Sequence, residues 1–158
     1  MLTWSSVPPN GTPHTIPLVR VPPHTAITGT ILSDQMIGTW VHFYGGRSYP
    51  CRGENCPACE DDIGSRWKAY LHILQDEPPR QIILEITEHT ARALADQTDG
   101  LPSLRGIRVR FSRRHPRRNA PVDVRLSNTH LPADSLPPSL DIPSHLERIW
   151  GIKRKRSS

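Results

Sequence analysis

The sequence predicts a mainly β fold, a five-stranded Greek-key barrel with one helix, flanked by proline-rich arms. Four stretches alternate between apolar and polar residues with the period of two that is typical of half-buried strands. A length of 158 residues suits one domain. Of the 17 prolines, six lie in residues 1–25 and four in 127–158. We therefore expect a folded core over residues 26–126 between two extended arms, 1–25 and 127–158.

The first strand is expected over residues 39–44, entered from residues 29–32 through a bend. It is followed by the most informative pattern of the chain. All three cysteines fall within nine residues in the spacing C-x4-C-x2-C, and a histidine stands nine positions before the first. These candidate ligands are His42, Cys51, Cys56 and Cys59. Gly45-Gly46 allows the chain to fold back, and Cys56-Pro57-Ala58-Cys59 forms a tight turn that places two sulfurs together.

Thiolate and imidazole ligands, four in number, suit a tetrahedral structural Zn²⁺. An iron–sulfur cluster needs a fourth cysteine, and a disulfide leaves one cysteine over and needs an oxidising compartment. We predict zinc, with His42 as fourth ligand and His72, Asp61 or Asp62 as competitors. The chain lacks the zinc-protease and zinc-deaminase patterns, so we expect a structural metal and no enzyme.

The second strand is expected over residues 66–73, and its two faces differ in character. The apolar face carries Trp67, Ala69, Leu71 and Ile73. The polar face, expected to point outward, carries Arg66, Lys68, Tyr70 and His72. A third strand is expected over residues 81–86, with Ile82, Leu84 and Ile86 on one face.

A helix is expected over residues 87–97, where Ala91, Leu94 and Ala95 recur at helical spacing before Asp99-Gly100. Strands over 104–114 and 122–126 then form a hairpin around a basic loop. Five strands with a helix between the third and the fourth match an OB-like barrel with a zinc-binding loop insertion. An SH3-like barrel, or a zinc ribbon with an appended sheet, is the alternative.

The charge is unevenly distributed. Residues 1–99 carry seven Lys and Arg against eleven Asp and Glu, whereas residues 100–158 carry thirteen against four. Such a skew favours a polyanionic partner. Six arginines crowd into residues 108–118, and they are Arg108, Arg110, Arg113, Arg114, Arg117 and Arg118. We expect them, with Arg66 and Lys68, to follow a nucleic-acid backbone, and Trp40, Tyr44 and Tyr70 to stack on bases. For Trp40 and Tyr44 a place in the core is the alternative.

A histidine, then a cysteine, then a Cys-Pro-x-Cys pair resembles the zinc-containing single-stranded DNA-binding protein of T-even phages. The matching residues here are His42, Cys51 and Cys56-Pro57-Ala58-Cys59, at shorter intervals. The wider pattern of residues 27–126 is similar to small proteins of bacterial and mobile-element genomes. The resemblance implies an OB fold and single-stranded DNA binding for phage or mobile-element replication or recombination.

The C-terminal arm predicts a short helix with Ser144 and Glu147 as capping box, ended by Gly151. Its apolar face, Leu146, Ile149 and Trp150, is expected to dock on a neighbouring subunit, with the basic run 153–156 beside it. The N-terminus lacks a basic region followed by an apolar one, and no apolar run approaches a membrane span, so we expect a cytoplasmic protein.

We therefore expect a single-stranded nucleic-acid-binding protein, with DNA favoured over RNA. The alternative is a zinc-containing adapter or subunit of a replication, transposition or RNA-guided defence complex.

Overall fold

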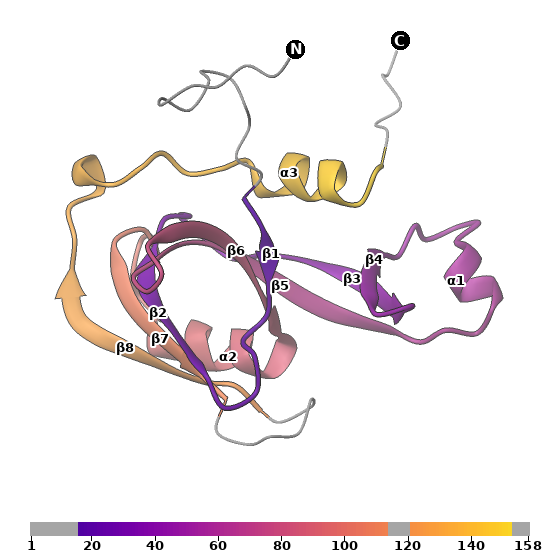
Figure 1. Cartoon of the computed structure of the whole chain (residues 1–158), viewed down its shortest axis with the longest axis horizontal. Helices are drawn as coiled ribbons and strands as arrows, with labels where there is room; N and C mark the ends of the chain where they lie inside the picture. Colours follow the sequence, from indigo (N-terminus) through magenta and orange to yellow (C-terminus); the bar gives the residue numbers. More distant parts are fainter. Residues whose placement is uncertain (1–15, 114–120, 153–158) are drawn as a thin grey trace, which may run out of the picture.

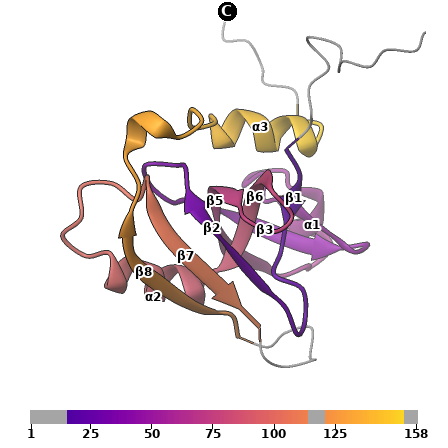
Figure 2. The same cartoon turned by 60° about the vertical axis from the view of Figure 1, so that its left-hand side comes forward.

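The computed structural model describes residues 16–113 and 121–152. These form one open, mixed β-sheet with three α-helices and a 3₁₀ turn (Figures 1 and 2). The strands are β1 (Leu18–Val19), β2 (Ala26–Ile31), β3 (Ile37–Tyr44), β4 (Arg47–Pro50), β5 (Ser65–Gln75), β6 (Arg80–Thr87), β7 (Ile107–Ser112) and β8 (Asp123–His130). The helical elements are α1 (Pro57–Glu60), α2 (Glu88–Gln97), η1 (Ala133–Ser135) and α3 (Ile142–Ile149). No helix in this part of the chain has the length and apolar character needed to cross a membrane.

The sheet follows the order β1-β6-β5-β2-β7-β8 and curls strongly, with α2 below it in Figure 1. Strands β5 and β6 pair antiparallel along eight residues, whereas β1 pairs parallel with β6 through Leu18 and Val19. Within the described residues the sheet does not close into a barrel. The mainly β character is confirmed, and the sheet extends on both sides of residues 26–126, from β1 to the end of β8.

Strand β5 organises the fold because it is eleven residues long and has partners on both edges. Along one edge, β2 lies opposite residues 73–75 and β3 lies opposite residues 65–70. The two strands thus follow one another end to end, which confirms the predicted bend. Strands β3 and β4 with α1 and the start of β5 project beyond the sheet, to the right in Figure 1. We call residues 37–66 the extension.

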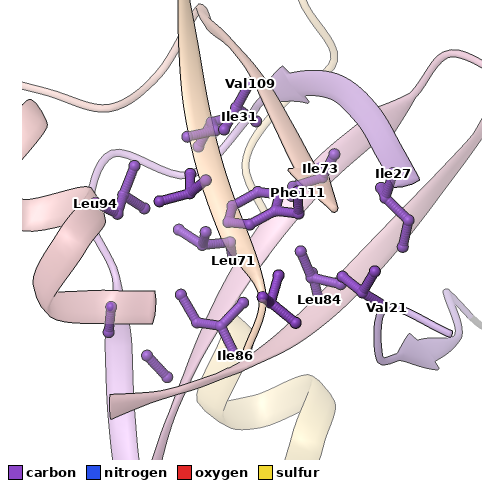
Figure 3. Close-up of a cluster of buried hydrophobic side chains, with 14 of the residues drawn as sticks. Val21, Ile27, Ile31, Leu71, Ile73, Leu84, Ile86, Leu94, Val109 and Phe111 are labelled. Atoms are coloured by element: carbon purple, nitrogen blue, oxygen red, sulfur yellow. The ribbon is translucent and has the colours of Figure 1, made fainter. Parts of the chain in front are cut away.

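The main core lies on the apolar faces predicted for β5 and β6 (Figure 3). Leu71 and Leu84 are fully buried and meet Phe111 from β7 and Leu94 from α2. Truncating such a side chain to alanine costs about 2–5 kcal/mol in other proteins, because the transfer free energy is lost and a cavity remains. Helix α2 begins at Thr87, whose hydroxyl accepts a hydrogen bond from the Thr90 N–H.

The opposite face of β5 is not exposed along its length, and this corrects one sequence prediction. Tyr70 and His72 are fully buried, so Tyr70 does not lie on an outward stacking surface. A second apolar cluster joins Tyr70 and Ile83 to Ile142 and Leu146 of α3. The polar face is solvent-facing only toward the extension, where Arg66 is exposed and Lys68 is half-buried.

Helix α3 covers this face of the chain's own sheet, above the sheet in Figures 1 and 2. Leu146 and Trp150 of the face expected to dock on a neighbouring subunit thus pack on the chain's own sheet, whereas Ile149 stays 37 % exposed. The predicted capping box is wrong, since Asp141 is the N-cap and its carboxylate accepts the Ser144 N–H. Pro143 fits within the first turn, where its missing N–H has no partner to lose. Gly151 ends the helix with φ +70°, as predicted.

Candidate metal centre and adjoining clefts

The four predicted metal ligands converge at the far end of the extension. His42 comes from β3, Cys51 directly follows β4, and Cys56 and Cys59 lie at the start of α1 and within it. The β3–β4 hairpin that brings them together turns at Gly45-Gly46, with φ of +59° and +78°, the left-handed backbone that a two-residue hairpin turn requires.

The spacing of the ligand atoms fits a tetrahedral zinc ion. His42 Nε2 lies 3.5 Å from Cys56 Sγ and 3.4 Å from Cys59 Sγ, and the Sγ atoms of Cys51 and Cys59 are 3.6 Å apart. With Zn–S bonds of about 2.3 Å and Zn–N bonds of about 2.0 Å, a tetrahedron needs S···N separations of about 3.5 Å and S···S separations of about 3.8 Å. The cluster is therefore compatible with zinc.

The competing fourth ligands stay outside this cluster. All four ligand atoms lie within 4.8 Å of one another, and in residues 16–113 and 121–152 this is the grouping compatible with a metal ion. Asp61 and Asp62 are exposed on the turn after α1, and His72 is buried in the sheet. The geometry thus favours His42 as the fourth ligand.

Main-chain carbonyl groups fix the orientation of the His42 ring on the side that faces away from the thiols. Its Nδ1 lies 2.8 Å from the Ile63 carbonyl oxygen and 3.2 Å from that of Gly64. A carbonyl can only accept, so Nδ1 carries the proton and Nε2 presents its lone pair to the thiols. Metal-binding histidines commonly have such a second hydrogen bond, which sets the tautomer and the ring plane.

The thiols are polarised by their surroundings. Main-chain N–H groups, that of Arg52 first, lower the pKa of Cys56 to about 6, so a thiolate is available at neutral pH. The Gly53 N–H lowers the pKa of Cys51. The hydrogen bond with Cys51, together with burial and the neighbouring Cys56, raises the pKa of Cys59 to about 11. A bound dication would attract all three thiolates, so their mutual repulsion would no longer oppose ionisation of the Cys59 thiol.

Beside the extension lies a cleft of about 850 Å³, which we call the first cleft. One wall is the loop 20–23, another is the extension with Phe43 and residues 63–66, and Arg113 at the end of β7 completes it. The cationic residues that line it are Arg20, Arg66, Lys68 and Arg113. Burial is the main cause that lowers the pKa of Lys68.

Phe43 gives the first cleft an exposed aromatic surface. Its side chain is 56 % exposed, and the Arg20 guanidinium carbon lies 4.8 Å from the ring centroid. The same arginine is held by Glu85, at 2.8 Å from Nε, and by the Ser48 hydroxyl. Arg20 is therefore fixed between β4, β6 and the Phe43 ring.

A second cleft, of about 590 Å³, adjoins the first. Arg20, Gly46 and Ser48 line both clefts. The second cleft adds Arg47 and Tyr49 from β4, and Ile149 and Trp150 from the end of α3. Glu85, at its base, is only 5 % exposed and also accepts a hydrogen bond of 3.0 Å from the Tyr70 hydroxyl.

The structure divides the residues predicted to contact nucleic acid. Arg66, Lys68 and Arg113 come together in the first cleft. Arg108 and Arg110 lie on β7 and line neither of the two clefts, and Arg108 pairs with both oxygens of Asp76, at 2.7 and 2.5 Å. Arg114, Arg117 and Arg118 lie outside the described residues.

The predicted stacking residues are also separated. Trp40 and Tyr44 are 55 % and 40 % exposed. They share the His42 face of β3, whereas Val41 and Phe43, on the alternate face, line the first cleft. Sequence reasoning missed Phe43 and Arg20. The alternation along residues 39–44 could have placed Phe43 on the face opposite His42. Arg20 stands in a proline-rich stretch with no pattern that predicts a binding residue.

Comparison with known proteins adds no relative: no family model, no curated protein and no solved structure matches the chain.

Proposed function

We propose that this chain is a single-stranded nucleic-acid-binding protein, that the first cleft holds the strand, and that a structural Zn²⁺ holds the extension. The observation that carries the proposal is the meeting of four cationic side chains and an exposed phenylalanine in one cleft. Cations that follow phosphates and aromatic rings that stack on bases are the two devices of sequence-tolerant single-strand binding.

The order of the strands supports the proposal. If β2 and β3 count as one bent strand, the neighbours run third, second, first, fourth, fifth, with α2 between the third and the fourth. This order resembles that of the OB fold, a five-stranded and partly open Greek-key barrel, with β1 and β4 added and without closure of the sheet. OB folds bind oligonucleotides on the second and third strands, between the loop after strand one and the loop after strand four. Under this correspondence, Arg66 and Lys68 of the first cleft stand on the second strand, and the extension and Arg113 stand at the two loops.

The charges of the first cleft suit a phosphate backbone. Arg66 is exposed and Lys68 is half-buried, and they stand two residues apart on the same face of β5. Phosphates that bind there release condensed counterions, which gives affinity that falls with salt. The Phe43 ring, beside them, offers a π-face that accepts any base.

In this proposal the zinc ion stabilises the extension and takes no part in a chemical reaction. His42 and the three cysteines fill a tetrahedral shell, so no position remains for a reacting water. When bound, zinc supplies folding free energy by tying β3, the chain after β4 and α1 together. The same ligand order stands in the T-even phage proteins that the sequence resembles.

Binding of labelled oligonucleotides to the zinc-loaded protein tests the proposal. Fluorescence anisotropy should give tighter binding to oligo-dT than to a duplex of the same length, with RNA as a third probe. The logarithm of the association constant should fall linearly with the logarithm of salt concentration, by about 0.7 for each phosphate contact. Equal or tighter binding to the duplex would overturn the proposal.

The second candidate is a zinc-containing adapter within a replication, transposition or RNA-guided defence complex. One observation favours it: Trp40 and Tyr44 are exposed on the metal face of the extension, opposite the first cleft. Exposed aromatics of this kind are enriched at protein interfaces. Absence of single-strand binding, together with aggregation that is relieved in Trp40→Ala, would favour this candidate.

A further inference from the structure

We propose that the strand-binding surface continues from the first cleft past Arg20 into the second cleft, where Trp150 of α3 stacks on a base. A long single strand is then held in two successive segments of the surface. This inference rests on the proposed function and extends it, because the C-terminal helix becomes part of the binding site.

The two clefts are continuous through three shared residues. Arg20, Gly46 and Ser48 line both, so a strand that leaves the Phe43 side of Arg20 reaches the second cleft around the tip and the β4 edge of the β3–β4 hairpin. Gly46 has no side chain, and an added Cβ would meet nothing within 4 Å. The hairpin tip at Gly46 therefore leaves open space between the two clefts.

Arg20 is suited to mark the boundary between the segments. Its Nε pairs with Glu85 and its Nη2 donates to the Ser48 hydroxyl, at 2.5 Å. A guanidinium fixed in this way costs little further conformational entropy when a phosphate binds beside it. Its side chain is still 45 % exposed, and it lines both clefts.

The second cleft has the same chemistry as the first. Arg47 supplies an exposed cation, and Tyr49 and Trp150 supply aromatic surface. The carboxylate of Glu85 does not oppose a phosphate there, because Arg20 neutralises it and the Tyr70 and Ser48 hydroxyls donate to it. A cleft with cations and aromatic rings fits a nucleotide of any base.

Trp150 is held in place before any ligand binds. It is the C-cap of α3, and its N–H donates to the Leu146 carbonyl oxygen at 2.8 Å. Its ring meets Tyr70 edge-on, with ring centroids 5.9 Å apart. A pre-ordered aromatic ring loses little freedom on stacking, which favours affinity. Three residues later the sequence continues with Lys153-Arg154-Lys155-Arg156, so four more cations follow Trp150 along the chain.

A length series of oligo-dT tests this extension. We expect affinity to rise in two stages as the strand grows from about 4 to about 16 nucleotides, the range of site sizes of one OB fold. Trp150→Ala should leave the affinity for the shortest bound strands unchanged and lower that for long strands by about 5-fold to 100-fold. Arg47→Ala should lower the salt slope for long strands only.

Matched controls separate local from general effects. Trp40→Ala removes an exposed tryptophan from the opposite face of the extension, and Arg92→Ala removes an exposed arginine from α2. Neither should change the dependence on length. Trp150→Phe should keep most of the second stage, because a smaller ring still stacks. If Trp150→Ala loosens α3, Arg47→Ala gives the decisive result, since Arg47 is exposed in the hairpin and outside the apolar clusters.

Two results would overturn the extension while the proposed function stands. One is wild-type affinity that stops rising once the shortest strands bind. The other is a second stage that survives in both Trp150→Ala and Arg47→Ala. Failure of the wild-type protein to bind strands of any length would instead overturn the proposed function itself.

Discussion

His42 Nδ1 donates to the main-chain carbonyl oxygen of Ile63 at 2.8 Å, and Ile63 is part of the wall of the first cleft. The opposite nitrogen of the same ring faces the three thiols. The candidate metal and the candidate binding surface are thus one side chain and one hydrogen bond apart. Arg66 follows Ile63 by three residues and pairs with Val41, the neighbour of His42, in the ladder between β3 and β5.

The metal centre gives the first prediction. Purified protein should contain about one zinc ion per chain, and Cys56→Ser should lower zinc content and melting temperature together, because the site supplies folding free energy. Asp61→Asn is the control, since Asp61 is exposed near the site and is not one of the four clustered residues. Metal analysis and thermal melts measure both quantities. A zinc-free protein that melts unchanged after chelation would contradict the prediction.

The second prediction concerns the cations. Arg66→Ala should weaken single-strand binding and lower the salt slope by about 0.7, the loss of one phosphate contact. Arg108→Ala should have a smaller effect, because Arg108 already pairs with Asp76 and lies outside both clefts. Salt titrations of both variants give the slopes. A larger effect at Arg108 would place the binding surface on the β7 face instead.

Phe43 carries the third prediction. Phe43→Ala should weaken binding by about 1–3 kcal/mol, the value of one stacked base, with little change in the salt slope. Trp40→Ala is the matched control, because Trp40 is exposed on the alternate face of β3 and lines neither cleft. Binding isotherms at several salt concentrations separate stacking from charge. Equal losses in both variants would show that the strand does not distinguish the two faces.

The fourth prediction concerns α3. Leu146→Ala should destabilise the protein by about 2–5 kcal/mol, because Leu146 is buried against the second apolar cluster of the sheet. Ile149→Ala should cost less, since Ile149 is 37 % exposed. Chemical denaturation of both variants measures the difference. A helix that docked only on a neighbouring subunit would instead make the cost of Leu146→Ala depend on protein concentration.

His72 gives a prediction for pH. It is fully buried, and its Nδ1 accepts the Leu140 N–H at 3.2 Å, which requires this nitrogen to be unprotonated. Burial lowers the pKa of His72 below its usual value of 6.5. The unfolded chain therefore binds more protons at this residue, and the free energy of unfolding should fall as pH drops below about 6.5. Denaturation between about pH 7 and pH 5 should show this loss, and His72→Gln should reduce it, whereas His89→Gln, at an exposed site on α2, should not.

Sequence patterns predicted the parts of this fold that depend on near neighbours. The alternation of residues 66–73 identified the core face of β5, and residue type with spacing identified all four residues of the histidine–cysteine cluster. The burial of Tyr70 was not predictable in this way, because the residues that cover it come from both ends of the described chain, Leu18 and Ile142 among them. The ion pair between Arg108 and Asp76 joins residues 32 positions apart, so charge counting could not reveal it.

The most direct test of the account is an NMR titration of the zinc-loaded, ¹⁵N-labelled protein with a short oligo-dT. The account predicts the largest amide shifts in the first cleft, at Arg20 and Val21, at Phe43, and at residues 63–66 and Lys68. Amides of α2, on the far side of the main core, should shift little and serve as internal reference. Amide shifts confined to β7 around Arg108 and Arg110, or no shifts at a large excess of oligo-dT, would contradict the account.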